Sequence, residues 1–232
     1  KPAFEQEVQR LLDEDVLAEC QSPYHSPIIP ILKADGSLRL MNNFKQLNSK
    51  IRDDQFMMAN PYEIVTKAAS KPFLSQVDLS KAFLQVSLDK RFHHVTAWSC
   101  YLGQFCWKRM AQGLSGAPRT MQRLITTLLK NTSKFASALQ DNIVIYSNTW
   151  EEHCAHIKEI LSRLRRANLT ASLSKSEFAM KSLDVLGWRI EGGGIHPCEK
   201  RVDAILKMAP QRTKKGVRAL VGLVNYYRNL IP

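Results

Sequence analysis

Near the N-terminus, apolar residues recur at the spacing of an amphipathic helix, which predicts a helix over residues 3–18. The residues that carry this pattern are Phe4, Val8, Leu11 and Leu12. The next segment, SPYHSPIIPIL, has three prolines in eight residues and cannot continue a helix. We therefore expect it to be extended.

Short β-prone runs flanked by turn residues predict two hairpins. Asp35-Gly36 lies between the apolar runs IIPIL and LRLM, which predicts antiparallel strands over residues 28–41. Farther along, ALQDNIVIYS predicts a tight hairpin with Gln140, Asp141 and Asn142 at its tip. A separate apolar run, FLSQV, ends in Asp78 and predicts another strand.

The rest of the chain alternates between weaker strands and helices. Strands are expected between Thr96 and Trp107, and a helix is expected to begin near Pro118. Thr149 can cap a helix that continues through Leu164. After the strand-like VLGWRIEGGGI, two helices are split near Pro210. This order predicts an α+β domain with an antiparallel sheet backed by helices.

Charge favours a polyanionic partner. The net charge is +12, and residues 199–232 hold eight Lys or Arg against two acids. Because no lipid-anchoring signal accompanies this excess, it indicates nucleic acid before membrane. No run approaches the roughly 20 apolar residues that span a bilayer, and the N-terminus lacks a signal-peptide pattern. We expect an intracellular protein, in cytoplasm or nucleus, and a fragment of a longer chain.

The five cysteines are scattered without a C-x-x-C pair, which is typical of neither a disulfide framework nor a zinc finger. His153, Cys154 and His156 cluster beside an apolar helical stripe. A metal site is one interpretation of this cluster. The favoured interpretation is that the three residues lie on one face of a helix, beside its core-facing stripe.

Two acids stand in apolar surroundings. Asp78 closes a strand and Asp141 lies at the tip of a hairpin, and such acids are costly unless a cation or metal pairs with them. Two carboxylates from separate strands could hold Mg²⁺, which prefers oxygen ligands. Taken singly, each acid is more simply a turn or strand-end residue.

Six blocks of the chain carry a resemblance to one known family. Three of them are QVDLSKAFLQVSL, KRMAQGLSGAPRTMQRLI and LQDNIVIYS. The other three are CQSPYHSPIIPILKADGSLRLMNNFKQLN, VLGWRIEGGGIHPCEKRVDAI and VRALVGLVNYYRNLIP. In their order along the chain, the blocks resemble the reverse transcriptases of gypsy-type LTR retrotransposons and retroviruses. QVDLSKAFLQVSL is similar to the block in which a catalytic Asp ends a strand, KRMAQGLSGAPRTMQRLI to the family's pocket block and LQDNIVIYS to its Tyr-x-Asp-Asp hairpin.

The resemblance covers nearly the whole chain and implies a right-hand polymerase fold that adds dNTPs to a primer 3′-hydroxyl on an RNA or DNA template. Asp78 and Asp141 match the carboxylates that hold two catalytic Mg²⁺ or Mn²⁺ ions, and Asn142 stands in the place of the third carboxylate. On the family's pattern, the fingers span residues 1–73 and part of 88–112, the palm spans 74–87 and 113–197, and a partial thumb spans 198–232.

The resemblance also implies residues that bind substrate. Lys33 and Arg39 match the pair that grips the triphosphate. Phe83 matches the aromatic gate that excludes a ribose 2′-hydroxyl, and Gln112 matches a glutamine of the nucleotide pocket. The primer grip matches Leu186, Gly187 and Trp188. Alone, each residue has an ordinary structural explanation, such as a hairpin-edge charge or a core aromatic.

Several positions depart from the family pattern. The hairpin reads Leu139, Gln140, Asp141, Asn142, so one charge of the metal site is missing. Asn43 stands in place of an acid, Lys45 in place of an arginine and Ala111 in place of a proline.

Three explanations of these departures remain open. The chain is an active polymerase that tolerates Asn142; or it is a domesticated or decayed copy that serves as a nucleic-acid- or protein-binding scaffold; or Asn142 is an engineered knockout, which leaves Asn43 unexplained. A further interpretation of the scaffold kind is that the chain is the non-catalytic partner in an asymmetric polymerase dimer.

Overall fold

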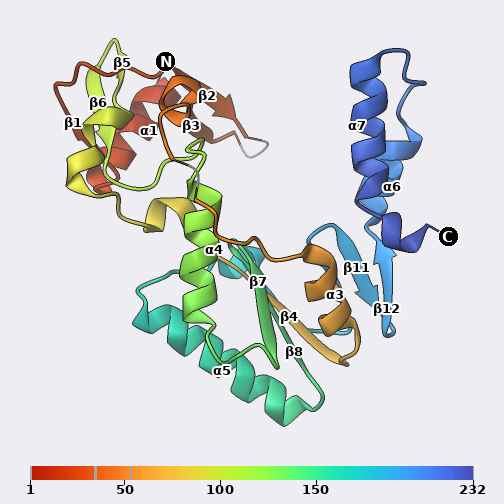
Figure 1. The fold of residues 1–232 in the computed structure, drawn as a ribbon. Helices are drawn as coiled ribbons and strands as arrows, with labels where there is room; N and C mark the ends of the chain where they lie inside the picture. Colours follow the sequence, from red (N-terminus) through yellow and green to blue (C-terminus); the bar gives the residue numbers. More distant parts are fainter. Residues whose placement is uncertain (1, 34–35, 53, 232) are drawn as a thin grey trace. The chain divides into compact units, whose positions relative to one another are not determined.

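The chain folds into two compact units, each assembled from segments distant in the sequence (Figure 1). The structure is a computed structural model that describes residues 2–33, 36–52 and 54–231. The first unit comprises residues 1–58, 79–128 and 164–170. The second unit comprises residues 59–78, 129–163 and 171–232.

The first unit combines helices with small antiparallel sheets. One sheet has the strand order β1–β6–β5, and another pairs β2 with β3. The strands are β1 (Leu17–Glu19), β2 (Ile28–Leu32), β3 (Leu38–Asn42), β5 (Trp98–Cys100) and β6 (Gly103–Trp107). The helices are α1 (Pro2–Asp13), α2 (Lys45–Asn48), α4 (Ala117–Leu128), and the 3₁₀ turns η1 (Ala82–Gln85), η2 (Lys90–Phe92) and η3 (His94–Thr96). Their shared core contains Leu11, Phe44, Trp98 and Trp107.

The predicted opening helix is too long. It ends at Asp13, and Leu17 begins β1, opposite Trp107 of β6. Asp13, Glu14 and Asp15 come at the C-terminal end, where acids oppose the helix dipole. Asp15 has a φ of 55°, which turns the chain out of the helix. The burial of Leu17 and its pairing within the sheet are more favourable than extending the helix to this residue.

The predicted N-terminal hairpin is confirmed as β2 and β3. Ile28 pairs with Asn42 and Leu32 with Leu38. Pro30 is tolerated because β2 is an edge strand of a two-stranded sheet. The turn residue Asp35 lies outside the described residues, while Gly36 has a φ of 78°.

The second unit is built around a four-stranded antiparallel sheet with the order β7–β8–β4–β9. Its strands are β4 (Phe73–Asp78), β7 (Ala136–Leu139), β8 (Asn142–Ser147) and β9 (Glu177–Met180). A smaller sheet contains β10 (Ser182–Val185), β11 (Trp188–Glu191) and β12 (Gly194–Pro197). The helices are α3 (Pro61–Ala69), α5 (Trp150–Arg166), α6 (Glu199–Leu206), α7 (Lys214–Asn225), and the 3₁₀ turns η4 (Leu173–Lys175) and η5 (Arg228–Leu230).

Alternation along the central strand separates two faces of this sheet. Leu74 lies opposite Tyr146, and both belong to a buried cluster with α3 and Trp188. Ser75 points to the other face, where it contacts His153 of α5. Helices therefore back the sheet, and the α+β class expected from the sequence is confirmed.

Other predicted elements are also present. Pro118 lies in the first turn of α4. Thr149 caps α5 because its hydroxyl accepts the amide of Glu152, whose carboxylate accepts the amides of Asn148 and Thr149 in return. The two C-terminal helices, α6 and α7, lie on either side of Pro210.

The histidines of α5 serve a buried polar network. The two ring nitrogens of His153 lie 2.7 Å from Ser75 Oγ and 2.8 Å from Ser147 Oγ. Ser147 Oγ is also 2.8 Å from His156 Nδ1, and His156 stacks on Phe135. Cys154 is exposed. Both ring nitrogens of His153 are hydrogen-bonded to serine hydroxyls. The interpretation of the cluster as helix residues beside the core is therefore correct.

This network predicts a loss of stability in mild acid. Burial lowers the pKa of both His153 and His156, so the unfolded chain takes up protons more readily than the folded chain. The stabilisation is present above about pH 6.5, the usual pKa of histidine, and is lost as the pH falls below it. Urea unfolding midpoints between pH 5 and pH 8 should show this slope, and His153→Gln should flatten it. The same change at exposed His25 is the control. Equal slopes for His153→Gln and the unmodified chain would contradict the assignment.

All five cysteines are free thiols in the structure. Across the described residues, each helix is too short or too polar to cross a bilayer.

Candidate functional site

The two central strands bring the sequence-predicted acids to one end of the four-stranded sheet. Asp78, the last residue of β4, lies directly opposite Asn142, the first residue of β8. Residues opposed in this way have Cβ atoms about 5 Å apart on the same face. Asp141 immediately precedes Asn142 in the turn that joins β7 to β8 (Figure 1). The structure thus gathers Asp78, Asp141 and Asn142.

The turn that carries Asp141 is held in a strained conformation. Leu139 pairs with Asn142, so Gln140 and Asp141 form a two-residue connection. Gln140 has a φ of 54°, in the left-handed region that costs a residue with a side chain about 1 kcal/mol or more. Such strain persists only where the surrounding structure enforces it. Here the paired strands β7 and β8, on either side of the turn, hold Gln140 in this conformation.

Asp78 is partly buried and is held in place by residues 172–176, which lie just before β9. Its side chain is 17% exposed, and its Oδ1 lies 4.0 Å from Lys175 Nζ. Its amide donates to Ser176 Oγ, and its carbonyl accepts the amide of Ser172. Burial raises the pKa of Asp78; Lys175 opposes this shift, and the charge of Asp141 adds to it. The two carboxylates are therefore electrostatically coupled.

Asn142 is fixed by a neighbour on β4. Gln76 Nε2 donates to Asn142 Oδ1 at 3.0 Å. Gln76 lies two residues before Asp78 and therefore on the same face of the strand. Its Oε1 is buried and, within the part of the chain that the structure describes, has no hydrogen-bond partner. An unpaired buried oxygen is costly, so this position favours a ligand that can bind oxygen.

The residues predicted to bind the nucleotide all lie in the first unit, which the structure describes by itself. Lys33 and Arg39 flank the β2–β3 turn, where Lys33 Nζ donates to Ser37 Oγ and Arg39 is exposed. Phe83 lies half-buried in η1. Gln112 precedes Gly113, whose carbonyl accepts from Asn48 Nδ2.

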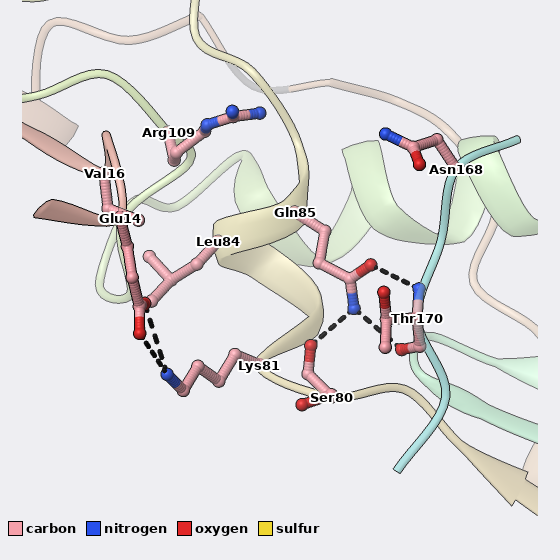
Figure 2. Close-up of a pocket in the computed structure, with 9 residues that line it drawn as sticks. All are labelled: Glu14, Val16, Ser80, Lys81, Leu84, Gln85, Arg109, Asn168 and Thr170. Carbon is pink, nitrogen blue, oxygen red and sulfur yellow. Dashed lines mark hydrogen bonds and ion pairs between the residues drawn. The ribbon is translucent and has the colours of Figure 1, made fainter. Parts of the chain in front are cut away.

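A cavity of about 350 Å³ in the first unit lies beside the turn that bears Phe83 (Figure 2). Gln85 links this turn to the segment before β9: its Nε2 donates to the carbonyls of Ser80 and Thr170, and its Oε1 accepts the Thr170 amide. On another wall, Lys81 pairs with Glu14 at 3.4 Å. The cavity lining includes none of the residues predicted from the sequence, but Gln85 helps to fix the position of η1.

The predicted primer grip forms a turn between β10 and β11. Leu186 and Gly187 connect Val185 to its partner Trp188, and both have positive φ angles. Trp188 is buried with Leu74 and Val144, so this turn and the sheet that bears Asp78 share one hydrophobic core. Asp78, Asp141 and the turn all belong to the second unit.

Two residues at the site could not be predicted from sequence patterns. Lys175 stands in a polar run, and its approach to Asp78 depends on how η4 folds against the end of β4. Gln76 reaches Asn142 only through the β4–β8 register. Register of this kind is set by tertiary pairing and is not visible in local spacing.

An antiparallel sheet that ends in two coupled carboxylates, backed by helices, defines a candidate metal-dependent site of the class found in nucleotide-transferring enzymes. The family model described as reverse transcriptase (RNA-dependent DNA polymerase) matches residues 31–190. The chain belongs to this family.

Curated relatives come from retrotransposons. The chain is 33% identical to the retrovirus-related Pol polyprotein from transposon 297 of Drosophila melanogaster, over 98% of this chain and 22% of that protein. It is 28% identical to the transposon Tf2-7 polyprotein of Schizosaccharomyces pombe, over 99% of this chain and 17% of that protein. The chain therefore spans about a fifth of the length of these relatives.

Solved structures of foamy viral protease-reverse transcriptase share the fold. A complex with double-stranded DNA matches with a TM-score of 0.91 and 27% identity, over 100% of this chain and 41% of that chain. A complex with an RNA/DNA hybrid matches with a TM-score of 0.85 and 26% identity, over 98% of this chain and 31% of that chain. These similarities agree with the reverse transcriptase resemblance found in the sequence.

Proposed function

We propose that this domain catalyses template-directed addition of deoxynucleotides to a primer 3′-hydroxyl, with release of pyrophosphate. The observation that carries the proposal is the convergence of Asp78 and Asp141 at one end of the sheet, with Asn142 opposite Asp78. Burial of the Asp78 carboxylate is costly and raises its pKa, and the nearby charge of Asp141 adds to that cost. A bound cation would remove that cost.

The residues present fit Mg²⁺ or Mn²⁺. All candidate ligands are oxygens, as hard cations prefer: the carboxylates of Asp78 and Asp141 would hold the metal, with Asn142 Oδ1 as a neutral ligand. The unpartnered buried Oε1 of Gln76 lies beside them. Divalent ions bound there would lower the pKa of the primer hydroxyl and neutralise charge on the transferred phosphate. Among the described residues, no group of three or more His, Cys, Asp or Glu that could hold a metal is assembled, and Asn142 stands where the third carboxylate is expected.

Other residues take supporting roles in this proposal. Lys33 and Arg39 would bind the triphosphate, Arg39 through its planar fork of donors. Phe83 would select against a ribose 2′-hydroxyl, and Gln112 would line the nucleotide pocket. The fingers, palm and thumb boundaries expected from the family pattern belong to the same proposal.

The proposed partner is a primer annealed to an RNA or DNA template. The net charge of +12 supports a nucleic-acid partner, and so do the foamy viral proteins solved in complex with DNA and with an RNA/DNA hybrid. Contacts between Lys or Arg and phosphates release counterions, so binding should weaken steeply as salt increases.

A second candidate is a scaffold that binds nucleic acid without catalysis. It is favoured by the loss of one carboxylate at Asn142, a change that keeps the shape of the side chain but removes its charge.

Single-nucleotide extension of a DNA primer on an RNA template separates the two candidates. With Mg²⁺ or Mn²⁺, we expect slow extension by the unmodified chain and template-directed choice of nucleotide. Tight, salt-sensitive binding of the primer–template without extension would support the scaffold. Absence of both binding and extension would contradict both.

A further inference from the structure

The turn between β10 and β11 presents two backbone carbonyls outside the strand ladder. Leu186 has a φ of 52° and Gly187 a φ of 81°, as in the two-residue turns that suit tight hairpins. Leu186 carries a side chain in this left-handed conformation, so its backbone is strained. The carbonyls of such a turn need partners from elsewhere in the fold.

Two adjacent tyrosines supply those partners from the end of α7. The hydroxyl of Tyr226 donates to the Leu186 carbonyl, and the hydroxyl of Tyr227 donates to the Gly187 carbonyl at 2.6 Å. The two carbonyls are not equally dependent on them. Gly187 also accepts the amide of Cys198 at 3.2 Å, whereas the Tyr226 hydroxyl is the donor found for Leu186 among the described residues.

The tyrosine rings pack on the next residue of the turn. Ring centroids of Trp188 lie 5.5 Å from Tyr226 and 4.7 Å from Tyr227, the latter pair edge to face. Tyr62 of α3 packs on Trp188 from 5.4 Å. Aromatic pairs of this kind contribute beyond the area they bury. The tyrosines thus hold the turn in two ways, by hydrogen bonds to its carbonyls and by ring contacts with Trp188.

Arg201 of α6 completes the contact. Its guanidinium lies over the Tyr226 ring, 4.6 Å from the centroid. It also fills the space where a side chain on Gly187 would stand, since a Cβ there would lie within 3 Å of the guanidinium. Arg201 of α6 and the two tyrosines that follow α7 therefore contact the same two-residue turn.

We propose that Tyr226 and Tyr227 are positioning residues that lock the turn of Leu186, Gly187 and Trp188 to α6 and α7, so that turn and helices engage a primer strand as one body. This inference rests on the proposed function and on the family resemblance, which assigns the turn to the primer grip and residues 198–232 to the thumb. The hydroxyls hold the turn in its strained conformation before nucleic acid binds. The turn then loses less conformational entropy when nucleic acid binds, because it is already ordered.

Tyrosine-to-phenylalanine variants test this directly, because they keep the rings and remove the hydroxyls. The probe is a fluorescent DNA primer annealed to an RNA template. Tyr226→Phe should accelerate its dissociation by about 2- to 12-fold, the range of one hydrogen bond's net contribution. Tyr227→Phe should have a smaller effect, because Cys198 still bonds to Gly187. The KM for dNTP should stay unchanged, since neither hydroxyl faces a nucleotide-binding residue.

Tyr62→Phe is the matched control, since Tyr62 packs on the same tryptophan without bonding to the turn. Amide hydrogen exchange at Trp188 and Cys198, without nucleic acid, gives a second readout. Exchange should be faster in Tyr226→Phe and unchanged in Tyr62→Phe. Dissociation rates equal to the unmodified chain, or an equal change in Tyr62→Phe, would overturn the proposal.

Failure of the proposed function is distinguishable from failure of this inference. If the unmodified chain binds no primer–template, the proposed function fails, and the exchange measurement alone decides whether the tyrosines lock the turn. Faster exchange then supports the lock, and unchanged exchange refutes it.

Discussion

Replacing Asp78 with Asn should reduce single-nucleotide addition at least about 100-fold while making the metal-free protein more stable. Loss of groups that merely support a metal ligand costs about 10- to 100-fold, so loss of a ligand's charge should cost at least the upper value. The measurement is the extension rate at saturating primer–template and dNTP. Asp13→Asn, an exposed acid on α1, is the control for the charge change.

The stability effect has the opposite sign for a physical reason. Burial raises the pKa of Asp78, and Asp141 adds to the shift, so the folded protein holds this proton more tightly than the unfolded chain does. The resulting stabilisation is fully present below the usual aspartate pKa of about 3.9 and is lost as the pH rises through the raised value. At neutral pH the charged carboxylate therefore costs stability. A lower urea midpoint for Asp78→Asn at pH 7 would contradict this explanation.

Replacing Asn142 with Asp should accelerate nucleotide addition by at least about tenfold. The change restores a negative charge directly opposite Asp78 and leaves the shape of the side chain unchanged. Gln76 Nε2 can donate to a carboxylate as well as to an amide, so the new side chain keeps its partner. The extension rate at limiting Mg²⁺ should show the largest gain, because added charge acts mainly on metal affinity.

The matched control is Asn131→Asp, the same change on an exposed residue of the α4–β7 connection. Without metal, Asn142→Asp should destabilise the protein, because a third acid joins two coupled carboxylates. A rate equal to that of the unmodified chain would mean that Asn142 is not the weakness of the site. In that case the other departures, Asn43 and Ala111, become the candidates.

The sequence was sufficient for the parts of the fold that depend on local patterning. The run that ends in Asp78 and the hairpin around Asp141 are bounded by turn residues, and their positions followed from that alone. The end of α1 could not be predicted in this way, because the helical pattern continues toward Leu17. Only the pairing of Leu17 with β6 shows that this residue belongs to a strand. A buried strand outweighs helical spacing when a partner strand is available.

The contacts within the site were less accessible to prediction. Apolar surroundings made Asp78 and Asp141 candidates, and the resemblance to the reverse transcriptase blocks decided that they act together. Lys175, Gln76 and the hydroxyls of Tyr226 and Tyr227 act through cross-strand register or through chain segments dozens of residues apart. Such contacts depend on how the elements pack, and short-range sequence patterns do not encode that packing.

Binding of Mn²⁺ tests most directly whether Asp78 and Asp141 form a metal site weakened by Asn142. Paramagnetic titration of the unmodified chain, Asn142→Asp, Asp78→Asn and the double variant forms a complete cycle. We predict about 10- to 100-fold tighter binding in Asn142→Asp than in the unmodified chain. Without Asp78, that gain should disappear in the double variant. Equal Mn²⁺ affinity in all four proteins would contradict a shared metal site.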